Sequence, residues 1–318
     1  MLKLTIQGSK LYEPIVLGGV QWETAQKGEP GKLTFTVVKD DVISFNEGAK
    51  VTFSVDGKEI FVGYVFTKTR NKDHHIQVVA YDQLRYFKNQ DVVVYKNKTA
   101  SEVVAMLAAD YRLTVGALDD TKHKIKQRVE DGQTLFDIVE NALKITQDST
   151  NKVFVLYDDA GKITLKDIQS MKLQTVIDDE TAEDFDYTSS IDVETYNYIK
   201  LVRESSEDGK RVISVDVKDD KNIEQWGRLQ YFEKISDNIN LKAHAEKLLK
   251  QYNHKTRTLR IQGALGDPSV RAGCMLPVML NLGDIIHNSY LICQRVVHTW
   301  EQGHHSMDIE MTGGDRFV

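Results

Sequence analysis

One stretch of this sequence is used twice, and the duplication limits the folds that the chain can adopt. Residues 45–82 and residues 270–315 share a pattern rather than an identity. Each opens near a glycine (Gly48, Gly273), runs through an apolar strand to a glycine-containing turn, and continues through two further strands. The turns are Asp56-Gly57 and Leu282-Gly283-Asp284, and the pairs His74-His75 and His304-His305 precede the two final strands. Such a repeat is one supersecondary unit used twice.

Alternation between apolar and polar residues predicts half-buried antiparallel strands in both copies. Residues 51–55 and 76–81 alternate in the first copy, and residues 307–311 alternate in the second. Short strands joined by glycine-containing turns are typical of small barrels and sandwiches, and closure removes exposed strand edges. We therefore expect a mainly β protein with an α+β insertion, in which one chain holds two related small antiparallel β-barrel domains.

The charge balance argues against nucleic-acid binding. The chain has 41 Lys+Arg against 47 Asp+Glu, a net charge of -6, and no basic block. A protein that binds the phosphate backbone needs a basic surface, so specific nucleic-acid binding is not expected.

Neither targeting nor redox signals stand out in the sequence. The first ten residues alternate like a strand and lack the apolar core of a secretory signal. No stretch approaches the roughly 18 apolar residues that span a bilayer. Cys274 and Cys293 have no metal-binding spacing, so neither a disulfide framework nor a zinc site is predicted, and a reduced, cytosolic origin fits best.

The period of the pattern changes twice between the two copies. We expect a first barrel domain over 1–96 with five or six strands, followed by a small α+β insert over 97–175. In the insert, Thr99 and Glu102 form a capping box ahead of a helix that runs to about Tyr111, and Thr134 starts a second helix with Asp137 at the matching position. The segments around Asp158-Asp-Ala-Gly161 then form a hairpin.

The second barrel domain is expected over 176–318, with a helical excursion near 236–254. Residues 178–186 are acidic and are interpreted as a solvated connector. A hairpin is predicted near 196–203 and 211–217, around Glu207-Asp-Gly-Lys210. The helix that follows places an apolar stripe on one face, which we interpret as core packing: Leu241, Ala245, Leu248 and Tyr252.

The sequence carries no catalytic constellation. It has no nucleophile elbow, no phosphate-binding loop and no HExxH helix, and Gly263-Ala-Leu-Gly266 is interpreted as a turn. No catalytic, cofactor-binding or metal-binding residue is therefore predicted, no cofactor is expected, and interface residues are not assigned. Strand aromatics such as Phe53, Phe61 and Tyr64 fit a core as well as an interface.

Two groups of residues suit metal or acid chemistry, but each has a simpler interpretation. His74-His75 and His304-His305, with His298 nearby, are interpreted as polar hairpin residues, because adjacent strand residues point to opposite faces. Zinc binding stays open as the alternative. The acidic run at 178–186 has no glycine for a calcium loop and no apolar pocket to raise a carboxyl pKa.

Several short motifs follow one another in a fixed order along residues 1–318. They are Phe61-Val-Gly-Tyr-Val65, Val79-Ala-Tyr-Asp-Gln-Leu-Arg85, Thr99-Ala-Ser-Glu-Val-Val104, Gly132-Gln-Thr-Leu-Phe-Asp137, Trp226-Gly-Arg-Leu-Gln230, Val296-Val-His298 and His305-Ser-Met307. Each motif alone is weak, but in this order they make the whole chain resemble the XkdQ/YqbQ family of PBSX-type phage tail proteins, the baseplate hubs of contractile tails and tail-like bacteriocins.

The resemblance implies a structural protein rather than an enzyme. Two similar barrels in each of three chains give six similar positions, so a homotrimeric ring adapts a six-fold tail tube to a three-fold central spike. The partners implied are the tail tube protein, the spike protein and other baseplate proteins. The chain would be made in the bacterial cytoplasm and assembled into the tail.

Because the chain stops after its last strand, we expect the spike and any lytic activity to belong to other chains. The alternatives are a peptidoglycan-binding or wall-degrading tail component and a carbohydrate-binding adhesin. The first rests on Gly132–Asp137, which resembles the opening of a LysM module.

Overall fold

The computed structural model describes residues 1–204, 212–235, 239–281 and 286–313, and the chain forms two compact units. The large unit combines Met1–Phe185 with Arg260–Met311, and the small unit contains Asp186–Leu259. The predicted turns at 282–284 and 207–210 lie outside the described residues. In the described part of the chain, no helix combines the length and the apolar character that a membrane crossing needs.

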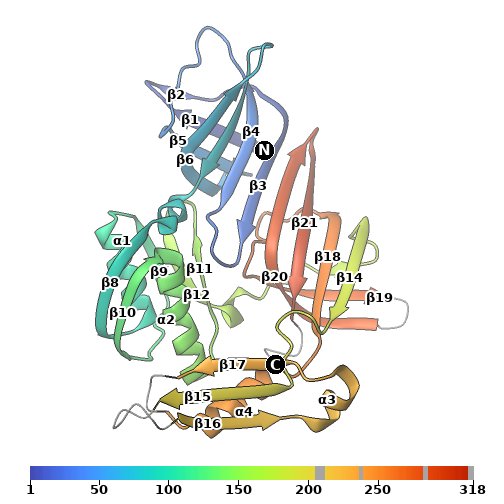
Figure 1. Cartoon of the computed structure of the whole chain (residues 1–318). Helices are drawn as coiled ribbons and strands as arrows, with labels where there is room; N and C mark the ends of the chain where they lie inside the picture. Colours follow the sequence, from blue (N-terminus) through green and yellow to red (C-terminus); the bar gives the residue numbers. More distant parts are fainter. Residues whose placement is uncertain (205–211, 236–238, 282–285, 314–318) are drawn as a thin grey trace. The chain divides into compact units, whose positions relative to one another are not determined.

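The first repeat builds seven strands, shown in blue to teal in Figure 1. Their hydrogen-bonded order is β3-β4-β7-β6-β5-β1-β2, which is more strands than the five or six expected. The strands are β1 (Leu2–Gln7), β2 (Leu11–Tyr12), β3 (Val16–Ala25), β4 (Lys32–Val38), β5 (Lys50–Val55), β6 (Lys58–Arg70) and β7 (His75–Tyr81).

The second repeat follows the same order, β14-β18-β21-β20-β19, and the short β13 pairs with β19. The predicted three-strand pattern is confirmed, because β19, β20 and β21 match β5, β6 and β7 in sequence order and in pairing. The strands are β13 (Ile177–Asp178), β14 (Asp184–Ser190), β18 (Thr256–Leu265), β19 (Met275–Asn281), β20 (Ile286–Glu301) and β21 (His304–Thr312).

The two repeats share one sheet, which corrects the expectation of two separate barrels. β20 pairs with β3, so the order runs from β14 to β2 without a pairing between the two ends in the described residues. The cause is the length of β20: its 16 residues pair first with β19 and then, from Arg295 to Trp300, with β3. The mainly β class is correct, but the described residues form no closed barrel.

Two further expectations on the second repeat are wrong. The acidic run is not wholly a connector, because Asp184–Asp186 begin β14, where exposed and half-buried residues alternate. Gly263-Ala-Leu-Gly266 is not a turn, because β18 extends to Leu265. In both cases strand pairing overrides the local composition.

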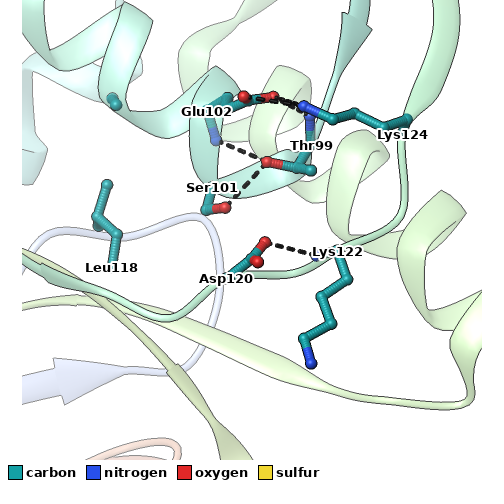
Figure 2. Close-up of a pocket in the computed structure, with 8 residues that line it drawn as sticks. Thr99, Ser101, Glu102, Leu118, Asp120, Lys122 and Lys124 are labelled. Atoms are coloured by element: carbon teal, nitrogen blue, oxygen red, sulfur yellow. Dashed lines mark hydrogen bonds and ion pairs between the residues drawn. The ribbon is translucent and has the colours of Figure 1, made fainter.

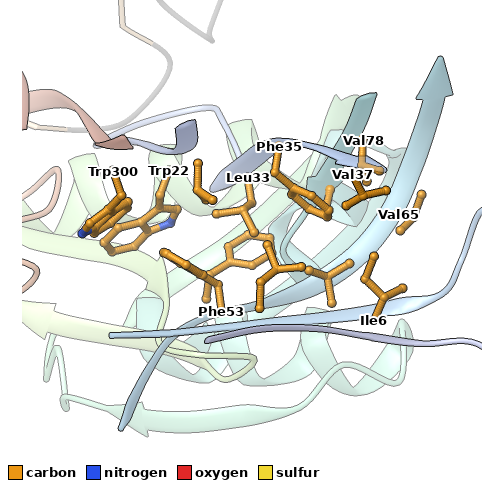
Figure 3. Packing of buried hydrophobic residues seen from close by; sticks show 14 of the residues in the cluster. Ile6, Trp22, Leu33, Phe35, Val37, Phe53, Val65, Val78 and Trp300 are labelled. Atoms are coloured by element: carbon orange, nitrogen blue, oxygen red, sulfur yellow. The ribbon is translucent and has the colours of Figure 1, made fainter. Parts of the chain in front are cut away.

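The core of the first repeat takes side chains from both repeats. Phe35, Phe53 and Val78 come from strands of the first repeat, and Trp300 comes from β20. Figure 3 shows Trp300 and Trp22 at one end of this cluster and Ile6 at the other. Trp300 meets Phe53 edge to face, with the ring centroids 5.0 Å apart. The first repeat therefore depends on residues that follow it by more than two hundred positions.

The insert between the repeats is α+β, as expected. Both capping boxes are confirmed, Thr99 with Glu102 and Thr134 with Asp137, and the hairpin of β11 and β12 is confirmed as well. The elements are η1 (Gln83–Lys88), β8 (Gln90–Lys98), α1 (Ala100–Asp110), β9 (Val115–Leu118), β10 (Ile125–Thr134), α2 (Leu135–Thr150), β11 (Phe154–Asp158), β12 (Ile163–Asp167) and η2 (Ile168–Met171).

The small unit packs one helix on a three-stranded sheet. The predicted hairpin is confirmed as antiparallel β15 and β16, and the predicted apolar stripe lies in a core with Ile199 and Leu201. The elements are β15 (Tyr198–Glu204), β16 (Val212–Lys218), α3 (Asp220–Trp226), β17 (Gln230–Lys234) and α4 (Leu241–Tyr252).

Candidate functional site

The junction between the two repeats, which we call the seam, is the most distinctive site in the large unit. Six residue pairs join β3 and β20 in antiparallel register, from Arg295 opposite Ala25 to Trp300 opposite Val20. The N–H of Gln26 donates to the Gln294 carbonyl at 2.9 Å and extends the ladder by one bond. The seam therefore joins two equivalent structural units edge to edge through the main chain.

Matching backbone bonds fix how the two repeats superimpose. Gly48 N–H donates to the Val65 carbonyl at 2.7 Å, and Val65 N–H donates to the Ala49 carbonyl. In the second repeat, Gly273 N–H donates to the Cys293 carbonyl at 2.8 Å, and Cys293 N–H donates to the Cys274 carbonyl. Gly48 thus corresponds to Gly273, and Val65 corresponds to Cys293. When the alignment is continued from Val65 and Cys293, residues 66–72 of the first repeat correspond to residues 294–300 of β20.

An aromatic stack fills the inner face of the seam. The His298 ring lies between Trp22 and Trp300, at centroid distances of 5.1 and 5.3 Å, and His305 stacks on Trp300 at 4.3 Å. His298 Nε2 donates to the Val270 carbonyl at 2.9 Å, so the neutral ring accepts at Nδ1 from His305 Nε2, also at 2.9 Å. The histidines thus fix the geometry of the stack.

Burial keeps His298 neutral. Loss of water around the ring, with a smaller contribution from the neighbouring His305, lowers the pKa of His298 from 6.5 to about 3, although the hydrogen bond to Val270 acts in the opposite direction. The pKa of His305 is lowered too, mainly by burial. Neither ring is therefore a proton carrier near neutral pH, and the pair serves structure.

An ion pair crosses the seam at its outer face. The Arg295 guanidinium of β20 contacts the Glu23 carboxylate of β3, and Lys32 Nζ lies 2.5 Å from the same carboxylate. The Glu23 side chain is only 12% exposed, so the two cations hold it at one position. The basic residue lies on β20 and the acidic residue on the first strand of the other repeat.

A buried polar cluster ties the insert to the repeats of the large unit. Asp82 accepts from the N–H groups of Gly31 and Leu84, and Asp158 accepts from Gln83 Nε2 and from the N–H of Gly161. Burial raises the pKa of both carboxyls, and the charge of Asp158 raises that of Asp82 further. Because each of the four carboxylate oxygens has a donor, the cluster anchors backbone rather than presenting a free acid to a substrate.

The insert carries a surface hollow beside the start of α1, shown in Figure 2. Lys124 Nζ binds both oxygens of Glu102 at 2.9 and 2.8 Å, and Glu102 also accepts from the N–H of Thr99. These bonds lower the pKa of Glu102 to about 2. Asp120 accepts from the N–H of Lys122. Glu102 and Lys124 are thus paired with each other, Asp120 is held by a main-chain group, and the hollow offers no convergent set of reactive groups.

Of the residues considered from sequence, the structure brings together only one histidine pair. His298 and His305 meet in the stack, whereas His304 and His74 are exposed. No group of three or more His, Cys, Asp or Glu side chains that could hold a metal occurs among the described residues. The seam itself was not predicted from the sequence. The available signal was the length of the apolar pattern at 290–300, which exceeds that of its counterpart in the first repeat.

A family model described as YQBQ-like matches residues 20–312. The chain belongs to the YQBQ-like family. Among its relatives, the phage-like element PBSX protein XkdQ of Bacillus subtilis is 28% identical over 98% of this chain and 97% of its own length. The resemblance inferred from the ordered motifs is thereby confirmed.

Solved structures share the fold of this YQBQ-like protein at low sequence identity. A 43 kDa tail protein of prophage MuSo2 from Shewanella oneidensis aligns with a TM-score of 0.74 at 12% identity, over 99% of this chain and all of its own. The c3393 protein of E. coli aligns with a TM-score of 0.57 at 12% identity, over 99% of this chain and 78% of its own. That protein is a type VI secretion component with structural similarity to the T4 tail proteins gp27 and gp5.

Proposed function

We propose that this YQBQ-like protein is a structural, non-enzymatic hub in the baseplate of a contractile phage tail or tail-like bacteriocin. Three copies form a ring that adapts a six-fold tail tube to a three-fold central spike. Its partners are then the tube protein, the spike protein and other baseplate proteins. It is made in the bacterial cytoplasm and assembled into the particle. The chain divides into repeat domains at 1–96 and 176–318 with an insert at 97–175.

The observation that carries this proposal is the duplicated strand order joined edge to edge at the seam. A chain with two equivalent units presents two similar positions, so three chains present six. Closure of such a ring requires head-to-tail interfaces made from repeated surfaces, which the two repeats supply. The names of the relatives support the same assignment, since XkdQ is a PBSX protein and the MuSo2 protein is a tail protein.

Native mass across a concentration series tests the ring. Sedimentation equilibrium should reveal a species near three times the chain mass of 36.2 kDa, roughly 109 kDa. A chain that stays monomeric at every concentration, and also after mixing with tube and spike proteins, contradicts the hub.

A second assay separates the hub from a wall-degrading enzyme. We expect the purified protein to leave the turbidity of a peptidoglycan suspension unchanged, because no acid and nucleophile pair lies in the hollow or the buried cluster. Clearing of the suspension contradicts the non-enzymatic assignment.

A further inference from the structure

The outer half of β6 has a strand on one edge only. β7 pairs with one edge up to Arg70, whereas pairing with β5 ends at Tyr64. The hairpin closes with Asn71 N–H donating to the His75 carbonyl, so alternation along the ladder turns Thr69 toward β7. The main-chain groups of Lys68 and Arg70 therefore point to the other edge, where no strand pairs with them in the described residues.

The same edge is occupied in the second repeat. Residues 66–72 correspond to 294–300 of β20, and there β3 pairs on the edge opposite β21. β3 is the first strand of its repeat in the shared order β3-β4-β7-β6. This edge of the repeat is thus built to receive the first strand of a neighbouring repeat.

The loop before β5 contacts this part of β6 through one side chain. Its Phe45 carbonyl accepts from Lys68 Nζ at 2.6 Å, and Phe45 corresponds to Val270, whose carbonyl accepts from His298. In both repeats the loop carbonyl thus accepts from a side chain of the long strand, although Lys68 and His298 lie two positions apart in the alignment. In the second repeat that loop coexists with β3 on β20, so the equivalent loop does not exclude a strand from β6.

The strand that fits is β14. It occupies the first place in β14-β18-β21-β20, as β3 does in its own repeat, and it is the last strand at its end of the sheet. We propose that β14 of a second copy of this chain pairs antiparallel with residues 66–70 of β6. Each chain then holds one such junction internally, at the seam, and forms one with each neighbour in the ring. This inference rests on the proposed ring.

Charge complementarity supports the pairing. The end of β6 and its turn carry the exposed residues Arg70 and Lys72, and β14 begins with the exposed Asp184. Lys68, on the same stretch, is half-buried and contacts Glu47. At the seam the signs are the same: Arg295 of β20 contacts Glu23 of β3. Basic residues on a free edge also discourage pairing with unrelated strands. A strand with acidic residues can pair with this basic edge, whereas unrelated strands are disfavoured.

Cysteine cross-linking of the full chain tests the contact directly. Cys274 and Cys293 are buried, and burial raises the pKa of both thiols, so an introduced pair supplies the reactive groups. Arg70→Cys is combined in turn with Asp186→Cys, Tyr187→Cys or Thr188→Cys, because opposed strand residues lie within disulfide reach. We expect one combination to give a covalent trimer under mild oxidation, while each single variant stops at a dimer or below.

A proline variant supplies an independent measurement. Arg70→Pro removes a donor that points away from β7, so the fold is retained while strand addition is blocked. We expect trimer association to weaken at least tenfold, while the melting temperature of the dissociated chain at low concentration stays unchanged. The control is Arg70→Ala, which removes the same side-chain charge but keeps the N–H donor.

The outcomes separate this inference from the ring itself. A wild-type trimer whose cysteine pairs never cross-link, and which Arg70→Pro leaves intact, keeps the ring and overturns the β6–β14 contact. A chain that is monomeric at every concentration and yields no cross-linked species overturns both.

Discussion

The β6–β7 hairpin of the first repeat and the β20–β21 hairpin of the second have the same design but different surroundings. The end of β20 is buried against β3 and carries Trp300 into the core of the first repeat. The corresponding end of β6 exposes Thr67, Thr69 and Arg70. The two hairpins differ most where β20 packs against β3 of the same chain. The neighbouring strand, rather than the position within the hairpin, therefore decides whether the side chains there are apolar or polar.

The two repeats are most alike at the residues that precede each hairpin. Gly48 and Gly273 both have positive φ values, 82 and 90, and both begin the bonding to the long strand. A residue with a side chain is strained at either position. Only Gly273 also lies against another segment, since a Cβ atom there would collide with Val155 of β11.

Removal of the Trp300 side chain should give the largest difference between the repeats. Trp300→Ala takes an indole from the core of the first repeat and from the aromatic stack. We expect a loss of about 3–5 kcal/mol in unfolding free energy, measured by urea denaturation. The equivalent position in the first repeat is Lys72, which is exposed, so Lys72→Ala should change stability by less than about 0.5 kcal/mol. Equal losses would contradict the proposed correspondence.

Alanine at the two hairpin glycines sharpens the comparison. Gly48→Ala meets no atom within 4 Å, so we expect only the backbone strain of about 1–2 kcal/mol. Gly273→Ala adds a collision with Val155, and we expect about 3 kcal/mol or more in total. Thermal melting of both variants measures the difference. The double variant Gly273→Ala with Val155→Ala should recover part of the loss, and no recovery would contradict the contact.

Acid should weaken the seam through His298. Its pKa is lowered to about 3 in the folded chain, so the unfolded chain binds the proton first as the pH falls below about 6.5. The stability that neutral His298 supplies is present above pH 6.5 and is lost progressively down to about 3. At pH 5 this loss should reach about 2 kcal/mol.

Urea denaturation at pH 7.5 and pH 5 measures this loss. His298→Gln should flatten the pH dependence, although it lowers stability at pH 7.5. His304→Gln is the matched control at an exposed histidine and should keep the wild-type profile. An unchanged profile in His298→Gln would show that other groups cause the acid sensitivity.

Neutralising the ion pair at the seam should have the smallest effect. Glu23→Gln keeps the shape of the side chain and removes its charge beside Arg295 and Lys32. Because Arg295 is half exposed, we expect a loss of at most about 1 kcal/mol, smaller at high salt. Urea denaturation at low and high salt measures it. A loss that does not depend on salt would mean that packing, not charge, acts there.

Local signals predicted most elements of the fold. The capping boxes at Thr99 and Thr134 located both insert helices, because the cap satisfies backbone groups within a few residues. The alternation of apolar and polar residues located the hairpins of both repeats, because that signal also lies within a few neighbouring residues. Pairings between distant segments could not be obtained in this way: no local property of Trp22 specifies His298 as its neighbour.

The candidate site was harder to predict than the fold. The seam consists of main-chain bonds and stacked rings contributed by two repeats, and neither repeat alone contains it. The histidines at 298 and 305 were noted as residues of interest, but their roles depend on burial against Trp22 and Trp300. Asp184 and Asp186 were interpreted as part of a connector because their acidic composition favours a loop. They form a strand through pairing with β18, which lies about seventy residues away in sequence.

The pairing of β3 with β20 also sets the timing of folding. Ala25 and Arg295 are neighbours in the sheet, so the core of the first repeat stays incomplete until the last strands leave the ribosome. At about 5–20 residues per second, synthesis of the intervening chain takes roughly 15–50 s. Throughout that interval the edge of β3 and the space for Trp300 remain uncovered. The newly made N-terminal half is therefore the stage at which this protein is most exposed to misassembly with other copies.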